Sequence, residues 1–282
     1  MERRVTVETL GEMKHLNEPI TMLTCYDYPT ARSMDDAGIE IIFIGDSVGT
    51  NVLGYDSPCD VTMDDMLHHT RAVRRGVKKG LVLVDMPYKS YETPEMALAN
   101  ARRFTDAGAD MIKLEGGREI AGIIRFLAEN NIAVMAHIGH TPQTFQEGGR
   151  VVVGITPEEA KGVYDDALEL EAAGAMSVLL ECVPAKVTEV ITRALSVPTI
   201  GIGCGSECDG QVLVVNDLLG WNDHSLRIFK KYDEYYDRSK RHFQGYISDV
   251  KSRKFPGEEN IFRIKQDAFD SFLTLTEAGS MA

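Results

Sequence analysis

The chain has 282 residues, of which 44% are hydrophobic and 26% are charged, and its formal net charge at pH 7 is −13. A chain of this length can bury one large core, and barrels of alternating strands and helices commonly use about 250 residues. The acidic balance would repel phosphate backbones, and no basic stripe with interleaved aromatic residues is present in the strand–helix body. Nucleic acid is therefore excluded as an expected partner.

Neither a signal peptide nor a membrane span is expected. The first nine residues are charged and lack an apolar core segment, and no uncharged run approaches the roughly 18 residues that a spanning helix needs. The five cysteines, at positions 25, 59, 182, 204 and 208, are odd in number, and three lie in or next to apolar strands. We therefore expect reduced thiols in a cytoplasmic protein rather than a disulfide framework.

Eight short apolar runs recur along the chain, separated by helical stretches. In chain order, strands are predicted at residues 20–26, 39–44, 81–87, 110–117, 132–137, 176–181, 198–203 and 212–217. The stretches between them predict helices at residues 28–37, 62–75, 118–129, 157–173 and 185–195, and one that opens at Thr93 and Pro94. A threonine cap followed by proline at the first position is a strong helix start.

This alternation is typical of a parallel α/β fold. Eight units favour a closed (β/α)8 barrel, the TIM barrel, while a doubly wound open sheet is the alternative. We expect one barrel domain over residues 1–260. It would include an amphipathic helix at residues 230–254 on the outside of the barrel, and residues 261–282 would form a C-terminal extension.

Polar side chains gather where the predicted strands end. In a barrel, all carboxyl ends of the strands lie on one face, where active sites of this fold are found. Seven residues, called the rim residues below, would lie there: Asp46, Ser47, Asp85, Lys113, Glu115, His137 and Glu181. Buried charges cost several kcal/mol unless they are paired or bind metal, so packing alone does not explain this set. Carboxylates with few soft ligands suit Mg2+ or a similar hard divalent cation.

Three other motifs favour structural roles. His137 and His140 could form a metal-binding pair, but a strand-end histidine that is hydrogen-bonded within the rim is favoured. Cys204 and Cys208 lack the second cysteine pair of a zinc site, and Cys182 is more consistent with a small core residue than with a nucleophile.

The chain closely resembles the ketopantoate hydroxymethyltransferase family over roughly residues 21–259. The matching motifs occur in the family's order and are Tyr26-Asp27-Tyr28, Gly45-Asp46-Ser47-Val48-Gly49, Ala72-Val73-Arg74-Arg75-Gly76, Lys113-Leu114-Glu115-Gly116-Gly117, Thr141-Pro142-Gln143, Glu181-Cys182-Val183-Pro184, Asp209-Gly210-Gln211-Val212-Leu213 and Pro256-Gly257-Glu258-Glu259. The resemblance implies a TIM barrel of the phosphoenolpyruvate-mutase/isocitrate-lyase superfamily.

The resemblance also implies an activity in pantothenate biosynthesis. A hydroxymethyl group would pass from 5,10-methylenetetrahydrofolate to the α-keto acid 3-methyl-2-oxobutanoate through an enolate stabilised by Mg2+. Asp46 and Asp85 would bind the metal and face the substrate, with Glu115 beside the metal through water. Ser47, Lys113 and His137 would bind the keto acid, and Glu181 would be the base. Members of the family form homo-oligomers, so an oligomer is expected.

One loop departs from the family pattern. Where the family usually reads Gly-Gly-aromatic-Lys-Val-Gln-Gly-Arg, this chain has Gly148-Gly149-Arg150-Val151-Val152-Val153-Gly154-Ile155. A lysine, a glutamine and a basic residue are lost, and Arg150 is gained. Asn216 stands where the family commonly has histidine. The loop predicts a change in how polar substrates are held.

Two alternatives to the standard family reaction stay open. One is a related Mg2+-dependent enzyme that makes or breaks a C–C bond with another α-keto acid or acceptor. Lyases and mutases of the superfamily typically carry a reactive cysteine in a Lys-Lys-Cys-Gly-His loop, which this chain lacks. The other is a catalytically silent barrel that binds a keto acid. Glu181 argues against it, since a binding protein has no need of a base.

Overall fold

The protein is described by a computed structural model over residues 4–144, 151–222 and 228–279. Two compact units divide the chain, one spanning Met1–Asp233 and the other Glu234–Ala282. Among the described residues, no helix is both long and apolar enough to cross a membrane.

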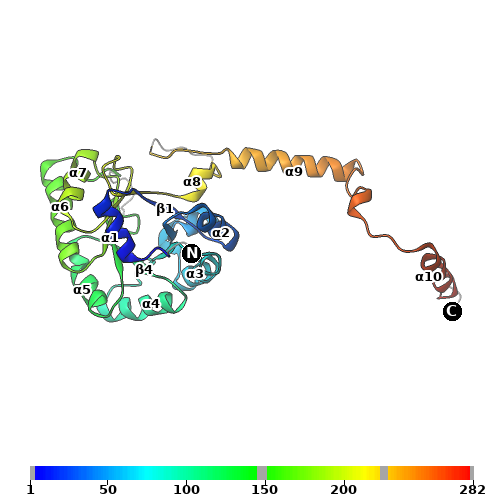
Figure 1. Ribbon diagram of the computed structural model, residues 1–282, viewed down its shortest axis with the longest axis horizontal. Coiled ribbons are helices and arrows are strands. Elements are labelled where there is room, and N and C mark those ends of the chain that lie inside the picture. Colours follow the sequence, from blue (N-terminus) through cyan, green and yellow to red (C-terminus); the bar gives the residue numbers. More distant parts are fainter. Residues whose placement is uncertain (1–3, 145–150, 223–227, 280–282) are drawn as a thin grey trace. The chain divides into compact units, whose positions relative to one another are not determined.

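The first unit contains a closed barrel of eight parallel strands, in which each strand pairs with the next and the last pairs with the first (Figure 1). The strands are β1 (Ile20–Thr24), β2 (Ile41–Ile44), β3 (Leu81–Asp85), β4 (Met111–Glu115), β5 (Val134–Gly139), β6 (Ser177–Glu181), β7 (Thr199–Ile202) and β8 (Gly210–Leu213). Closure confirms the predicted (β/α)8 barrel and excludes the open doubly wound sheet.

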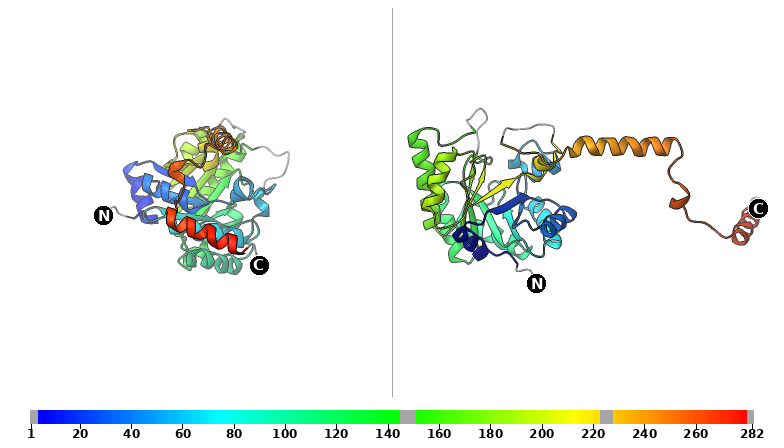
Figure 2. Two further views of the ribbon diagram at one scale, coloured as in Figure 1. Left: turned by 90° about the vertical axis from the view of Figure 1, so that its right-hand side faces the viewer. Right: turned by 45° about the horizontal axis from the view of Figure 1, so that its top comes forward.

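Helices of the first unit surround the strands (Figure 2). They are α1 (Val7–Leu16), α2 (Tyr28–Ala37), α3 (Met63–Gly76), α4 (Pro94–Asp106), α5 (Ala121–Glu129), α6 (Pro157–Ala172), α7 (Ala185–Ala194) and α8 (Val215–Leu219). Threonine side chains cap several of the helix starts, and the cap at Thr93 was predicted from the sequence. The Thr93 side chain accepts a hydrogen bond from the Met96 amide, and Thr62 forms a capping box with Asp65.

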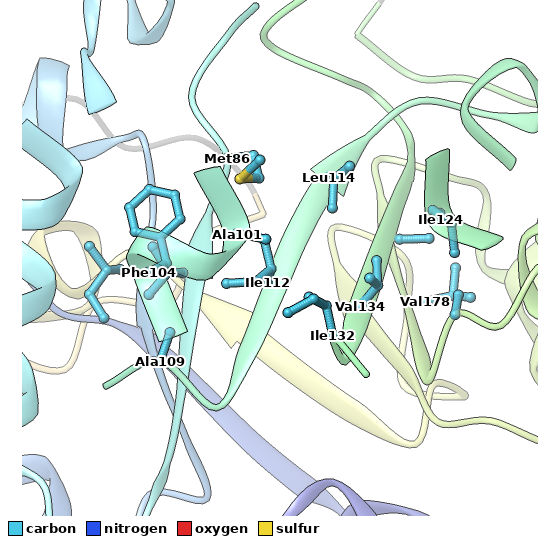
Figure 3. Packing of buried hydrophobic residues seen from close by; sticks show 14 of the residues in the cluster. Met86, Ala101, Phe104, Ala109, Ile112, Leu114, Ile124, Ile132, Val134 and Val178 are labelled. Carbon is cyan, nitrogen blue, oxygen red and sulfur yellow. The ribbon is translucent and has the colours of Figure 1, made fainter. Parts of the chain in front are cut away.

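Two apolar layers follow from the alternation of side chains along each strand. One layer lies between strands and helices and includes Ile112, Val134 and Val178 (Figure 3). The other fills the barrel interior and includes Phe43, Leu83 and further residues at every second strand position. Successive side chains of a strand point to opposite faces, so a residue's position along its strand decides which layer it joins.

Helix α1 was not predicted from the sequence. It begins with a capping box between Thr6 and Thr9, and its Leu10 belongs to the same buried cluster as the barrel-interior residues. The helix has a single fully buried residue, so its hydrophobic pattern is too weak to stand out.

The eighth strand was predicted at residues 212–217, and this was wrong in its bounds. The strand ends at Leu213, and Val215 already begins α8, with its amide donating to the Thr24 hydroxyl at 2.9 Å. The strand starts two residues early, at Gly210, where a Cβ would lie 2.5 Å from the Ile20 carbonyl oxygen. Only glycine fits this close strand pairing, and a glycine interrupts the apolar run that marks a strand.

The second unit consists mainly of α9 (Tyr235–Lys251) and α10 (Gln266–Gly279), joined through a short 3-10 turn, η4 (Glu258–Asn260). Ser239 is the buried residue of α9, while Phe243 and Tyr246 are exposed. The expected place of this helix on the outside of the barrel stays a prediction.

Candidate functional site

Strand alternation directs five of the rim residues into the barrel. Asp85, Lys113, Glu115, His137 and Glu181 each lie two or four positions beyond a residue of the interior layer, such as Leu83, Met111, Met135 or Leu179. Their side chains therefore point inward at the carboxyl ends of β3, β4, β5 and β6. Strand pairing places Asp85 beside Lys113, and Glu115 beside His137.

Asp46 and Ser47 come from the turn after β2. A Cβ on Gly45 would lie 2.9 Å from the Ser47 Oγ atom and 3.1 Å from the Phe43 ring, so glycine lets the chain fold back here. The Asp46 amide donates to Asp85 Oδ2 at 3.2 Å. The Ser47 hydroxyl lies 2.8 Å from the hydroxyl of Tyr26, which is buried. The turn thus brings both residues to the mouth of the barrel.

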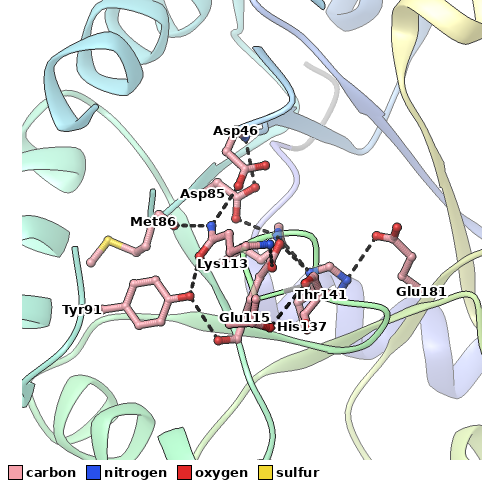
Figure 4. A network of polar contacts seen from close by, with 11 residues as sticks. Asp46, Asp85, Met86, Tyr91, Lys113, Glu115, His137, Thr141 and Glu181 are labelled. Carbon is pink, nitrogen blue, oxygen red and sulfur yellow. Dashed lines mark hydrogen bonds and ion pairs between the residues drawn. The ribbon is translucent and has the colours of Figure 1, made fainter. Parts of the chain in front are cut away.

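Lys113 lies at the centre of the polar network (Figure 4). Its Nζ atom is 2.7 Å from Asp85 Oδ1, 3.3 Å from Glu115 Oε1 and 3.2 Å from His137 Nδ1. Burial opposes the charge of Lys113, but the neighbouring carboxylates of Asp85 and Glu115 raise its pKa above the usual value. Burial likewise opposes ionisation of Glu115, whereas Lys113 and His137 lower its pKa. Lys113 and Glu115 are therefore both charged at neutral pH.

His137 connects this network to Glu181. Its Nδ1 atom is 3.1 Å from Glu115 Oε1, and its Nε2 atom is 3.3 Å from Glu181 Oε2. Burial and Lys113 lower the pKa of His137, but Glu115 and Glu181 outweigh them and raise it to about 9. The Glu181 side chain is 22% exposed, against 3% for His137. Glu181 is thus the more solvent-accessible end of the network.

The surroundings of Asp46 and Asp85 disfavour the ionised form of both side chains. Burial is the main cause that raises the pKa of each, and Glu115 adds to it in both cases. Asp85 also raises the pKa of Asp46, while Lys113 opposes both shifts. Two buried carboxylates that repel each other are stabilised when a cation binds between them or beside them.

Gln143 and Tyr91 also belong to the network, although the sequence assigned no role to either. The Gln143 Nε2 atom donates to Asp46 Oδ2 at 2.8 Å and to the Met86 carbonyl at 2.9 Å. Its backbone amide donates to Glu115 Oε2 at 3.0 Å, and its Oε1 atom accepts from the Tyr91 hydroxyl at 2.6 Å. The motif Thr141-Pro142-Gln143 lies just beyond β5, and this position was the signal available in the sequence.

A cavity of about 300 Å³ opens above this network. All seven rim residues line it, together with His140 and Cys182. Apolar walls come from residues of several strands and loops, among them Phe43, Leu179, Ile202 and Val212. The sequence prediction that the seven side chains converge therefore agrees with their positions, while their chemical roles stay predictions.

The loop that departs from the family pattern reaches the same cavity with its described residues, 151–155. Val151 lines the cavity, and the Val153 amide donates to the Cys182 carbonyl at 3.0 Å. Cys182 has a φ of 53°, so the residue after Glu181 adopts a left-handed conformation that is uncommon for a side chain other than glycine. Val152 and Ile155 are exposed. Arg150, the basic residue that the loop gains, lies outside the described residues.

The donor set fits Mg2+. Among the residues that the structure describes, no group of three or more His, Cys, Asp or Glu side chains is arranged to hold a metal ion. Mg2+ needs fewer protein ligands, because it keeps several waters and uses one or two carboxylates together with substrate oxygens. Asp46 and Asp85 provide two such carboxylates on one cavity, and a cation would relieve their repulsion.

Similarity to known proteins identifies the family of this chain. Residues 4–258 match the family model described as ketopantoate hydroxymethyltransferase. A 3-methyl-2-oxobutanoate hydroxymethyltransferase of Clostridium novyi is 46% identical over 269 residues, which cover 94% of this chain and 98% of that protein. The enzyme with the same name from Syntrophus aciditrophicus is 47% identical over 264 residues, covering 92% and 97%.

Solved structures with a similar fold are more distant in sequence. A phosphoenolpyruvate phosphomutase from Streptomyces platensis has a TM-score of 0.60 at 14% identity and covers 98% of this chain and 99% of its own. A 2,3-dimethylmalate lyase, described as a PEP mutase/isocitrate lyase superfamily member, has a TM-score of 0.58 at 14% identity, with coverage of 98% and 96%. These likenesses show the fold alone. The family match and the close relatives show that the chain belongs to the ketopantoate hydroxymethyltransferase family and is an enzyme of the hydroxymethyltransferase type.

Proposed function

We propose that the protein transfers a hydroxymethyl group from 5,10-methylenetetrahydrofolate to C3 of 3-methyl-2-oxobutanoate and so forms ketopantoate. The names of the relatives support the keto acid. The observation that carries the proposal is the contact of Glu181 with a buried network of opposite charges on one cavity. Such a network offers a base on one side and stabilisation of negative charge on the other.

Asp46 and Asp85 would hold Mg2+, and Glu115 would lie beside it through water. When bound, the ion would supply a Lewis acid that polarises the oxygens of the keto acid. The two aspartates are the residues of the network that gain most from a cation, because burial and mutual repulsion oppose their ionisation without one. Metal binding would therefore stabilise the ionised forms of both aspartates.

Lys113 and Ser47 would bind the oxygens of the keto acid. Lys113 keeps its proton because the surrounding carboxylates raise its pKa, so it presents a fixed positive charge where negative charge develops on the keto oxygen. Asp85 and Glu115 hold the Nζ atom in place from two sides. Apolar walls from Phe43 and other residues of the cavity exclude water from the reacting atoms.

Glu181 would remove the proton from C3. The C3–H bond breaks, its electron pair shifts toward the keto carbonyl, and His137 holds the protonated Glu181 in position from its other side. C3 then forms a bond to the methylene carbon of the folate donor. Both C–N bonds of the methylene carbon break, and water supplies the hydroxyl oxygen. Tetrahydrofolate leaves with one new hydrogen on each of the two nitrogens, one that came from C3 and one from water. The sum is keto acid, methylenetetrahydrofolate and water giving ketopantoate and tetrahydrofolate.

A second candidate is the same chemistry with another α-keto acid or acceptor. The observation that favours it is Val151, which lines the cavity where the family usually has lysine. An apolar side chain there removes one donor for an anionic or polar group.

Cytoplasmic location and assembly as a homo-oligomer are also part of the proposed function, and the family membership supports both.

The direct test is incubation with 3-methyl-2-oxobutanoate, Mg2+ and methylenetetrahydrofolate, with the products identified by mass. Ketopantoate formed at a rate that depends on enzyme and on Mg2+ supports the proposal. Formaldehyde in place of the folate separates the donor from the keto acid. Rejection of this keto acid with turnover of another would favour the second candidate.

A further inference from the structure

We propose that Gln143 is a positioning residue for the two carboxylates Asp46 and Glu115, and that Tyr91 acts through it by fixing the orientation of its amide. The inference rests on the proposed function, because Asp46 and Glu115 matter here as residues that hold or flank a divalent cation. Neither Gln143 nor Tyr91 would contact the reacting atoms.

Gln143 is buried, with an exposed fraction of only 3%, and its side-chain amide and backbone amide both form hydrogen bonds. The side-chain amide donates twice from Nε2, to Asp46 Oδ2 at 2.8 Å and to the Met86 carbonyl at 2.9 Å. The backbone amide donates to Glu115 Oε2 at 3.0 Å. Gln143, in the loop after β5, therefore binds one carboxylate from the turn after β2 and one from β4. A buried polar group with all its partners present holds a single geometry.

The surroundings allow one orientation of the amide. Both partners of Nε2, a carboxylate oxygen and a backbone carbonyl, are acceptors, so the nitrogen must face them. Oε1 then faces the Tyr91 hydroxyl, which donates at 2.6 Å. The Tyr91 hydroxyl lies farther, at 3.1 Å, from its other acceptor, the Glu115 carbonyl. A flipped amide would set Oε1 against two acceptors in a buried site, which is costly.

This arrangement fixes how Asp46 faces the cavity. The amide engages Oδ2 and so sets the rotation of the carboxylate, while Oδ1 lies outside this contact. The backbone bond from Gln143 engages Oε2 of Glu115, whose Oε1 faces Lys113 and His137. Groups that orient metal-binding carboxylates typically change metal affinity by about 10- to 100-fold when they are removed.

The test measures metal affinity apart from catalysis. Mn2+, which prefers the same oxygen ligands as Mg2+, is titrated into the full-length protein without keto acid or folate, and free Mn2+ is followed by electron paramagnetic resonance. The variants are Gln143→Met, which keeps the length of the side chain without its amide, Tyr91→Phe, and the double variant. Asn100→Leu is the matched control, because Asn100 donates an amide hydrogen bond to the Ser90 carbonyl next to Tyr91.

We expect Gln143→Met to weaken Mn2+ binding by about tenfold or more. Tyr91→Phe weakens it by about threefold, and adds nothing when Gln143 is already replaced, because both act through one amide. Asn100→Leu leaves Mn2+ affinity unchanged even where its melting temperature falls. Tyr91→Phe loses a single oxygen and keeps the test usable should Gln143→Met unfold.

Two results would overturn this inference and leave the proposed function standing. One is Mn2+ affinity within twofold of the unsubstituted protein in Gln143→Met with only the melting temperature lowered, which assigns Gln143 a structural role. The other is a Tyr91→Phe effect that is the same with or without Gln143. Absence of Mn2+ binding by the unsubstituted protein would instead overturn the metal assignment of the proposed function, and the inference with it.

Discussion

The Nε2 atom of His137 lies 3.3 Å from the Oε2 atom of Glu181, and this contact joins a partly exposed carboxylate to a buried charge network. With its pKa raised to about 9, His137 is protonated at neutral pH and balances the charge of Glu181. The contact holds the Glu181 side chain at the cavity, where it would act as the base of the proposed reaction.

Replacement of Glu181 separates proton removal from substrate binding. Glu181→Gln keeps the size of the side chain and removes its basicity, so the exchange of the C3 hydrogen of 3-methyl-2-oxobutanoate in D2O should slow by about 100-fold or more. Nuclear magnetic resonance measures the exchange, and keto acid affinity should be largely kept. Glu207→Gln, at an exposed site, is the control. Exchange at the unsubstituted rate in Glu181→Gln would assign the base elsewhere.

Metal binding should depend on both aspartates. Asp46→Asn and Asp85→Asn each remove a charged oxygen ligand from an ion that takes only one or two carboxylates from the protein, so each should weaken Mg2+ binding at least about tenfold. Isothermal titration calorimetry measures the affinity. Asp64→Asn, whose side chain is 90% exposed, should not change it. Unchanged affinity in both site variants would rule this assignment out.

Most of the barrel was predictable because its signals are local. Each strand is a short apolar run, and helix caps such as Thr93 and Thr62 depend on residues three positions away. The convergence of the rim residues follows from the same local pattern, since strand ends share one face in a barrel. The bounds of β8 failed where a long-range requirement prevailed, namely the close approach of Gly210 to Ile20.

Gln143 shows what local patterns cannot supply. Its contact with Asp46 joins positions 97 residues apart, and its contact with Tyr91 joins positions 52 apart. A glutamine in a loop is ordinarily a solvated residue, and only its place just beyond a strand end pointed to the site. The residues that bear charge were thus predictable, whereas the neutral side chain that orients them depends on the closed fold.

Asp35 should stabilise the fold in a pH-dependent way. Its carboxylate accepts hydrogen bonds from the backbone amides of Lys78, Lys79 and Gly80 at 3.0, 2.9 and 2.8 Å. Burial opposes ionisation, but these donors outweigh it and lower the pKa of Asp35. A lowered folded-state pKa stabilises the protein above the unfolded value of about 3.9, and this stabilisation is lost as the pH falls through the folded pKa.

Asp35→Asn should therefore lower the free energy of unfolding by about 2 kcal/mol at pH 7, since the charged acceptor of several bonds is lost. The difference should shrink below about pH 4. Urea denaturation at several pH values measures it. Asp36→Asn, at a side chain that is 70% exposed, is the control and should change little. A difference between Asp35→Asn and the unsubstituted protein that is constant with pH would contradict the charge-based explanation.

The loop from Val151 to Ile155 should alter substrate preference. Val151 lines the cavity, and the bond from the Val153 amide to the Cys182 carbonyl holds the loop beside Glu181. Compared with the family pattern, donors for anionic or polar groups are missing, and each charge-assisted hydrogen bond is worth roughly 1.5 to 3 kcal/mol, over tenfold in specificity. Under the second candidate function, activity with 3-methyl-2-oxobutanoate and the folate donor is weak, and activity with another keto acid or acceptor is higher. The combined exchange Val151→Lys, Val153→Gln and Ile155→Arg should raise kcat/KM for the standard pair about tenfold or more, whereas Val152→Lys, at an exposed position in the same loop, should not. Steady-state kinetics with a panel of keto acids decides between the standard family reaction and a shifted substrate preference. If the unsubstituted protein has full activity with the standard pair and the exchange does not improve it, the standard family reaction is retained.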